Sequence, residues 1–331
     1  MSNVSVTVAC GLYDHMEALS RGLVKPVGID VTYLGFQSPP EIFARMIKTN
    51  AFDISEMSLS SYFNLRSKGD FPFLALPIFP CRVFRHAYIF VNRDVDIAGP
   101  KDLEGKKIGV QQYRQTAATW IRGILNAEYG VDFSGVTWVE GGVNTPRSPD
   151  ADMDLMPGSK IDLISAPAGT SINDLLKSGE VAAYFGARMP NCYQTSQNIN
   201  RLFPDYRRVE REYFDKTGIF PIMHTLVIRE DLHRQKPWIA ENMYKAFEAS
   251  KRWALEHMRF TGTMRYMVPW LNHELEEIDD MFKGGDPYPN GVNANREVLE
   301  TLMQFLVDQE FVNAPAPAVD DFFIPMVEWA E

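Results

Sequence analysis

The sequence predicts an α/β protein built as two lobes with a ligand-binding cleft between them. Strand-like apolar runs alternate with amphipathic helical runs, and this alternation is typical of largely parallel sheets. The pattern occurs twice, once before Phe63 and again between Lys107 and Phe185. With 331 residues, the chain is also long enough for two domains.

Two β-rich runs are expected to connect the lobes. The first is Pro80–Asp94 and the second is Phe220–Asp231, each bounded by turn-forming or charged residues. We interpret the first as the strand on which the chain leaves lobe 1, and the second as the strand on which it returns. Residues 1–91 with 223–331 are then expected to form lobe 1, and residues 92–222 lobe 2.

Composition narrows the class of partner. The formal net charge of -10 disfavours nucleic acid, because phosphates attract a basic surface, but it leaves an anionic small molecule open. Three cysteines without metal-type spacing predict a reducing compartment. No run approaches the ~20 apolar residues that span a bilayer, and the first residues carry no export pattern. We therefore expect a cytoplasmic protein with no membrane partner.

Lobe 1 is expected to open with alternating strands and helices. The helix after the second strand begins at Ser38, which with Glu41 resembles a capping box, and Ser58 begins the next helix. The expected strands of this lobe are 3–9, 29–34, 52–57 and, on the return, 222–229. The later helices are expected at 237–260, 274–282 and 293–309.

Lobe 2 shows the same alternation. Its helix over 116–129 is expected to be capped by Thr116, and the Gly- and Pro-rich run 141–158 is expected to be an exposed loop. The expected strands of this lobe are 107–110, 136–139, 161–164 and 181–185.

Several common catalytic signatures are absent from the sequence. It contains no GxGxxG, no GxxxxGK[ST], no GxSxG, no HExxH and no CxxC. The six histidines are scattered, so their spacing defines no preformed metal site. The sequence therefore calls for no cofactor, although a weakly held divalent metal stays open.

Arg82, Arg85 and His86 form the strongest local signal. If Val83–Val91 is extended, Arg82 and His86 point to the same face of the strand. A guanidinium can hold a carboxylate by two contacts, and an imidazole can carry a proton. The alternative is a structural salt bridge between the lobes together with a histidine whose hydrogen bonds are satisfied.

Other candidates lie where strands end. Glu56 and Ser58 lead into a helix, whose first amides and serine hydroxyls suit an anion. Thr116 and nearby Tyr113 form the corresponding element of lobe 2, and Arg188 follows another strand of that lobe. For the Glu56–Ser58 and Tyr113–Thr116 elements the alternative is an ordinary helix cap, and Arg122 is expected to brace its helix.

The order of lobe, crossing strand, lobe, return strand and C-terminal helices resembles the type 2 periplasmic binding protein fold. Several stretches are similar to the 4,5-dihydroxyphthalate decarboxylase family, and the return-strand stretch is the most specific of them. These stretches are SEMSLSSY (55–62), PIFPCRVFRHAYIFVN (77–92), QTAATWIRGIL (115–125), FPDYRRVEREYFDKTGIFPIMHTLVIRED (203–231) and NGVNANREVLETL (290–302).

The resemblance implies a decarboxylase of aromatic catabolism that converts 4,5-dihydroxyphthalate to protocatechuate and carbon dioxide without a cofactor. A positioned acid would protonate the ring carbon, and the carboxylate would then leave. We expect His86 as the proton donor with His224 as the other candidate, and Glu56 to bind or deprotonate a ring hydroxyl.

The remaining candidates are expected to bind the substrate. They are Arg82, with Arg85 or Arg188 assisting, for a carboxylate, and Ser58, Tyr113 and Thr116 to complete the cleft. Two alternatives stay open: a non-catalytic binding protein for an aromatic carboxylate, and a metal-assisted lyase using both histidines and Glu56. The oligomeric state is also open, a homo-oligomer being among the alternatives.

Overall fold

The computed structural model describes residues 3–69, 71–147 and 159–326. The chain divides into two compact units. Unit 1 comprises residues 1–82, 224–299 and 318–331, and unit 2 comprises residues 83–223 and 300–317. Compared with the expected division, the first crossing lies after Arg82, and part of the C-terminal region belongs to unit 2.

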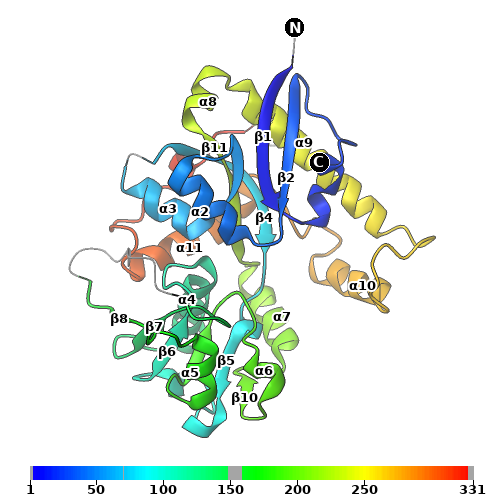
Figure 1. The fold of residues 1–331 in the computed structure, drawn as a ribbon. Helices are drawn as coiled ribbons and strands as arrows, with labels where there is room; N and C mark the ends of the chain where they lie inside the picture. Colours follow the sequence, from blue (N-terminus) through cyan, green and yellow to red (C-terminus); the bar gives the residue numbers. More distant parts are fainter. Residues whose placement is uncertain (1–2, 70, 148–158, 327–331) are drawn as a thin grey trace. The chain divides into compact units, whose positions relative to one another are not determined.

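Unit 1 contains a five-stranded sheet with the order β2-β1-β3-β11-β4 (Figure 1). Strand β1 pairs in parallel with β2 and β3, whereas β11 pairs antiparallel to β3. The strands are β1 (Val4–Gly11), β2 (Ile29–Phe36), β3 (Ile54–Ser58), β4 (Phe73–Arg82) and β11 (Ile222–Arg229). The helices are α1 (Glu17–Ser20), α2 (Pro39–Thr49), α3 (Leu59–Ser67), α8 (Glu230–Gln235), α9 (Trp238–Met258) and α10 (Leu271–Met281).

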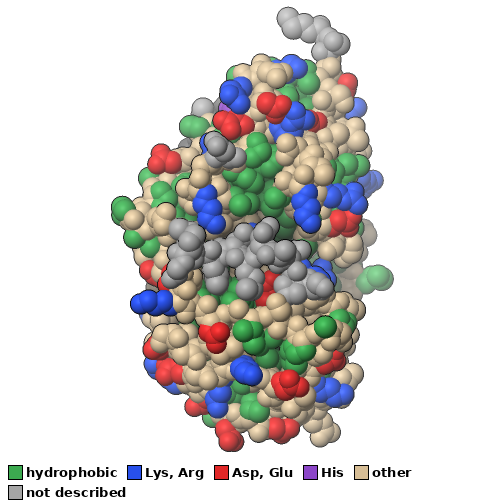
Figure 2. Space-filling model, turned by 60° about the vertical axis from the view of Figure 1, so that its left-hand side comes forward, with side chains coloured by type: hydrophobic (Ala, Val, Ile, Leu, Met, Phe, Trp, Pro, Cys, Tyr) green, Lys and Arg blue, Asp and Glu red, His purple; other side chains and the backbone are tan. Residues whose placement is uncertain are grey.

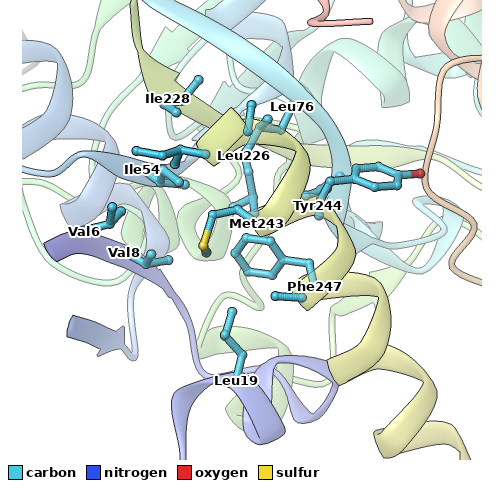
Figure 3. Close-up of a cluster of buried hydrophobic side chains, with 14 of the residues drawn as sticks. Val6, Val8, Leu19, Ile54, Leu76, Leu226, Ile228, Met243, Tyr244 and Phe247 are labelled. Atoms are coloured by element: carbon cyan, nitrogen blue, oxygen red, sulfur yellow. The ribbon is translucent and has the colours of Figure 1, made fainter. Parts of the chain in front are cut away.

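The long helix α9 covers one face of this sheet. Its apolar residues recur at helical spacing, as Ile239, Met243 and Phe247 show, and all three are buried. Figure 3 shows Met243 and Phe247 beside Ile54 and Leu226 of the sheet, and all belong to one hydrophobic cluster. Burying one such side chain contributes about 1.5–3 kcal/mol. This core fixes the strands whose ends carry the candidate site.

Unit 2 contains a six-stranded sheet with the order β10-β5-β9-β6-β7-β8. Strand β6 pairs in parallel with β7 and β9, while β5 runs antiparallel to β9 and β10. The strands are β5 (Ile89–Asn92), β6 (Lys107–Val110), β7 (Thr137–Glu140), β8 (Asp162–Ser165), β9 (Ala183–Phe185) and β10 (Ile199–Arg201). The helices include α4 (Thr116–Tyr129), α5 (Ile172–Ser178), α6 (Cys192–Thr195), α7 (Tyr206–Thr217) and α11 (Arg296–Asp308).

The expected single strand over Pro80–Asp94 is wrong. Strand β4 ends at Arg82, residues His86–Tyr88 form a 3₁₀ turn, and β5 begins only at Ile89. The Glu210 carboxylate on α7 accepts a hydrogen bond from the Ala87 N–H at 2.9 Å. Because the Ala87 N–H donates to this distant side chain, it does not pair with a neighbouring strand, and the segment forms a turn instead of a β-strand. Arg82 and His86 therefore do not share the face of one strand.

The expected cap at Thr116 is also wrong, because the N-cap of α4 is Gln115 and Thr116 is the first helical residue. Ser38 is the N-cap of α2 as expected, and Ser58 caps α3. Part of the expected loop 141–158, residues 148–158, lies outside the described residues.

No helix in the described part of the chain is long and apolar enough to cross a membrane. On the face drawn in Figure 2, acidic and basic side chains are interspersed and do not form one basic field. That pattern agrees with the acidic net charge of the sequence.

Candidate active site

Polar side chains gather at one edge of the unit 1 sheet. Gly11 ends β1, Glu56 lies near the end of β3, and His224 lies near the start of β11. In the β3–β11 pair, Leu226 lies opposite Glu56 and His224 lies opposite Ser58. His224 is thus the diagonal neighbour of Glu56, a spacing that long side chains can bridge. Carboxyl ends of strands are where open α/β sheets bind ligands.

Glu56 is the centre of this group. Its side chain is fully buried, and His224 Nδ1 lies 2.5 Å from Oε1. The Tyr13 hydroxyl donates to the same oxygen at 2.6 Å, and the Gly11 N–H donates to Oε2 at 2.7 Å. The Cys10 thiol lies 3.6 Å from Oε2. A buried carboxylate surrounded by donors is stabilised in its charged form.

The electrostatics favour an ion pair between Glu56 and His224. Burial alone would raise the pKa of Glu56, but the charge and hydrogen bond of His224, with Tyr13 and Gly11, hold it below its usual value. Burial alone would lower the pKa of His224, but Cys81 and Glu56 raise it to about 10. The imidazole is therefore protonated at neutral pH while the carboxylate is ionised.

The His224 side chain is partly exposed, unlike that of Glu56. Its side chain is 18% exposed, whereas Glu56 has no exposed surface. The Phe43 ring from α2 contacts the imidazole edge to face, with 5.0 Å between ring centroids. Cys81, near the end of β4 and half-buried, also hydrogen-bonds to His224. The sequence prediction included Glu56 and His224 but missed this cysteine.

Tyr13 is a second site residue that the sequence prediction missed. Its ring stacks on His15 with centroids 5.2 Å apart, and His15 lies 5.5 Å from the Tyr288 ring. His15 and Tyr288 also line a cavity about as large as one water molecule, together with Lys251. Burial, and then the charge of Glu56, raise the pKa of Tyr13, so its hydroxyl stays protonated and donates. Only its position after Gly11, at a strand end, could have signalled this role.

Ser58 lies where the sequence placed it. It caps α3, and its hydroxyl accepts a hydrogen bond from the Ser61 N–H at 3.4 Å. The amino end of a helix carries partial positive charge and favours an anion. Because Ser58 lies opposite His224, a carboxylate bound at this helix end would lie beside the imidazole.

Arg82 is held by the loop before α11. Its guanidinium is buried, donates to the Pro289 carbonyl at 2.6 Å and to the Asn295 side chain, and lies over the Phe79 ring. Burial lowers the pKa of Arg82 to about 10, which leaves it charged at neutral pH. These contacts anchor the loop, and a substrate contact for Arg82 stays a prediction.

His86 lies in a different setting. Its side chain is 1% exposed and lies among aromatic rings, with Tyr213 at 5.3 Å and Phe203 at 5.4 Å between centroids. Neither ring nitrogen has a hydrogen-bond partner within the described residues. Burial lowers the pKa of His86 to about 4, so the ring is neutral at neutral pH. This environment is that of a core histidine.

The remaining candidates belong to unit 2. Arg85 is buried, donates to the Met223 sulfur at 3.1 Å and lies over Tyr88. Tyr113 and Thr116 are buried, and Arg188 is exposed. Their substrate contacts stay predictions.

Arg122 braces α4 as expected. Its guanidinium lies 3.8 Å from the centre of the Tyr113 ring and donates to the Tyr113 carbonyl at 2.7 Å. It also donates to Gln309 at 2.7 Å. Tyr113 is therefore packed under a cation inside unit 2.

Among the residues that the structure describes, no group of three or more His, Cys, Asp or Glu side chains is placed to hold a metal ion. The donor set proposed for a metal-assisted lyase, which included Glu56, is therefore not assembled there.

Comparison with known proteins identifies the family. The chain is 37% identical over 305 residues to a 4,5-dihydroxyphthalate decarboxylase of Comamonas testosteroni, covering 92% of this chain and 91% of that protein. The chain belongs to the 4,5-dihydroxyphthalate decarboxylase family. A second member, from Pseudomonas putida, is 34% identical over 215 residues, which cover 65% of this chain and 83% of that one. The family relationship indicates a decarboxylase, as the sequence analysis expected.

Solved structures confirm the fold. A putative periplasmic sulfonate-binding protein SsuA from Methylobacillus flagellatus KT matches with a TM-score of 0.55 and 14% identity, covering 98% of this chain and 93% of that one. The alkanesulfonate-binding protein SsuA from Xanthomonas axonopodis pv. citri, bound to MOPS, matches with a TM-score of 0.54 and 8% identity, covering 99% and 100%. The fold is that of type 2 periplasmic binding proteins, as predicted. No protein-family model matches the chain.

Proposed function

We propose that the protein decarboxylates a hydroxylated aromatic dicarboxylate, with 4,5-dihydroxyphthalate as the first candidate and protocatechuate and carbon dioxide as products. Two decarboxylase relatives support the reaction class. The buried Glu56–His224 pair carries the proposal, because it supplies a protonated imidazole at a strand edge suited to ligands.

The proposed reaction depends on a positioned acid that protonates the ring, and its steps do not require a cofactor. A ring hydroxyl para to the departing carboxylate pushes electrons to the carbon that bears it. Protonation of that carbon gives a dearomatised intermediate, and the C–C electron pair returns to the ring as carbon dioxide leaves. General acid catalysis by a positioned side chain is commonly worth about 10²–10⁴-fold.

We assign the proton donor to His224, the second of the two candidates. Its imidazole is charged at neutral pH and 18% exposed. His86 is neutral at that pH and 1% exposed, so it neither holds the proton nor faces a ligand. After transfer, His224 is a neutral imidazole that recovers its proton from solvent.

Glu56 is a positioning residue in this mechanism. Both its oxygens accept hydrogen bonds, and the side chain has no exposed surface, so it does not reach a ring hydroxyl directly. It holds Nδ1 of His224 and thereby fixes the orientation of the imidazole ring. Tyr13, whose hydroxyl is also held by Glu56, fixes the carboxylate.

The spectator carboxylate is assigned to the amino end of α3. Ser58 caps that helix and lies opposite His224 in the sheet. Backbone N–H groups at a helix start bind carboxylates without an arginine. This placement puts the ring next to the imidazole.

One experiment separates catalysis from binding. Purified protein is incubated with 4,5-dihydroxyphthalate, and carbon dioxide and protocatechuate are measured over time, with binding followed by calorimetry. Stoichiometric release of both products supports the proposal. The fold match to sulfonate-binding proteins favours the alternative of a non-catalytic receptor, which binding without release would establish.

A further inference from the structure

Cys81 faces the same imidazole as Glu56. His224 lies between them, with Nδ1 2.5 Å from Glu56 Oε1 and a hydrogen bond to the Cys81 thiol. A nucleophile, a base and a carboxylate that orients the base are thus joined in one chain of contacts.

We propose that Cys81, His224 and Glu56 form a thiol–imidazole–carboxylate triad that makes Cys81 a site of covalent modification by soft carbon electrophiles. Cys81 is half-buried, so a small reagent reaches it, whereas Cys10 and Cys192 are 0% and 1% exposed. An imidazolium beside a thiol favours the thiolate, which is the reactive form.

The surroundings of the pair are defined on each side. Glu56 comes from β3, Tyr13 follows β1, and Tyr288 comes from the loop before α11; the Tyr13 and Tyr288 hydroxyls both interact electrostatically with Cys81. Burial, and then Cys81, raise the pKa of Tyr288 to about 12. Both phenols are thus neutral at neutral pH, and His224 is the cation of this group.

The chemistry balances without an added oxidant or reductant when the reagent is a haloacetamide. The thiolate forms an S–C bond, halide leaves, and the proton stays on His224. A second class of reagent is the ortho-quinones that form when a catechol product is oxidised, and this part of the proposal rests on the proposed function. Thiolate addition to the quinone ring forms an S–C bond, and one ring oxygen takes the His224 proton. The C–H proton at the attacked carbon then moves to the second oxygen as the ring regains aromaticity, which leaves a catechol thioether.

The test is the pH profile of alkylation in the folded wild-type protein. Iodoacetamide is added in limiting amount between pH 6 and pH 8, and mass spectrometry of peptides locates and quantifies the label. An ordinary thiol with a pKa near 8.5 reacts roughly 75-fold faster at pH 8 than at pH 6. We expect Cys81 to change by less than about threefold over this range, because its thiolate is already formed at pH 6.

The other two cysteines are internal controls, since they should stay unlabelled until the protein is unfolded in urea. His224→Gln should restore the steep profile at Cys81, and Cys81→Ser should remove the label. Labelling of Cys10 or Cys192 before Cys81, or a steep wild-type profile at Cys81, would overturn the proposal. The readout uses no substrate, so it is independent of whether the decarboxylase assignment holds.

Discussion

Replacing Glu56 by Gln isolates the contribution of the buried ion pair. The substitution keeps the shape but removes the charge that faces His224 at 2.5 Å. The pKa of His224, now about 10, should fall, because burial lowers it and only Cys81 still raises it once the carboxylate is gone.

The magnitude follows from the loss of one partner of a buried ion pair, which commonly costs about 3–5 kcal/mol. Because the pKa of His224 is raised in the folded state, its protonation stabilises the folded protein fully below pH ~6.5. This stabilisation is lost as pH rises through about 10. Because the pKa of Glu56 is lowered in the folded state, its ionisation stabilises the folded protein at pH values above the pKa of the unfolded state. This stabilisation is lost as pH falls through the folded-state pKa.

Urea unfolding at pH 7.5 and an NMR titration of the His224 ring measure both quantities. Glu56→Gln should lower the free energy of unfolding by about 3–5 kcal/mol. The matched control is Glu41→Gln, which removes an exposed i,i+4 pair with Arg45 and should cost under ~1 kcal/mol. A Glu56→Gln protein as stable as the wild type, with the pKa of His224 unchanged, would contradict this prediction.

Three further predictions concern pH and packing. Turnover should fall as pH rises through about 10, since His224 then loses its proton; a pH–rate profile flat to pH 11 would contradict this. Burial raises the pKa of Glu210 to about 7, so its ionisation costs stability as pH rises from ~4.5 through 7; Glu210→Gln should flatten the stability curve between pH 5 and 8 in urea titrations. Gly123→Ala should destabilise by ~1–3 kcal/mol because its Cβ would clash with the Phe305 ring, whereas Gly99→Ala, with open space around it, should not shift the urea midpoint.

The alternation of strands and helices was sufficient to predict the fold class. Apolar periodicity located α2 and α9 because each buries residues at helical spacing, whereas α4 is buried on all sides from Thr116 to Leu125. It failed at His86–Tyr88, where an apolar run forms a turn whose Ala87 N–H bonds Glu210. A contact between residues so far apart in the chain leaves no local signal.

The candidate site was predicted in part for a similar reason. Glu56 and His224 were noticed because they stand at strand ends, where chemistry concentrates. Tyr13 and Cys81 were missed because their roles arise only from packing around the other two. Arg82 looked like a free cation in the sequence, but it is folded against the loop that contains Pro289.

The most direct test of the central claim is the turnover of 4,5-dihydroxyphthalate by His224→Gln, with the exposed His273→Gln as control. We expect kcat to fall about 10²–10⁴-fold in His224→Gln and to be unchanged in His273→Gln, while circular dichroism shows both variants folded. Full turnover by His224→Gln, or a comparable loss only in His86→Gln, would contradict it.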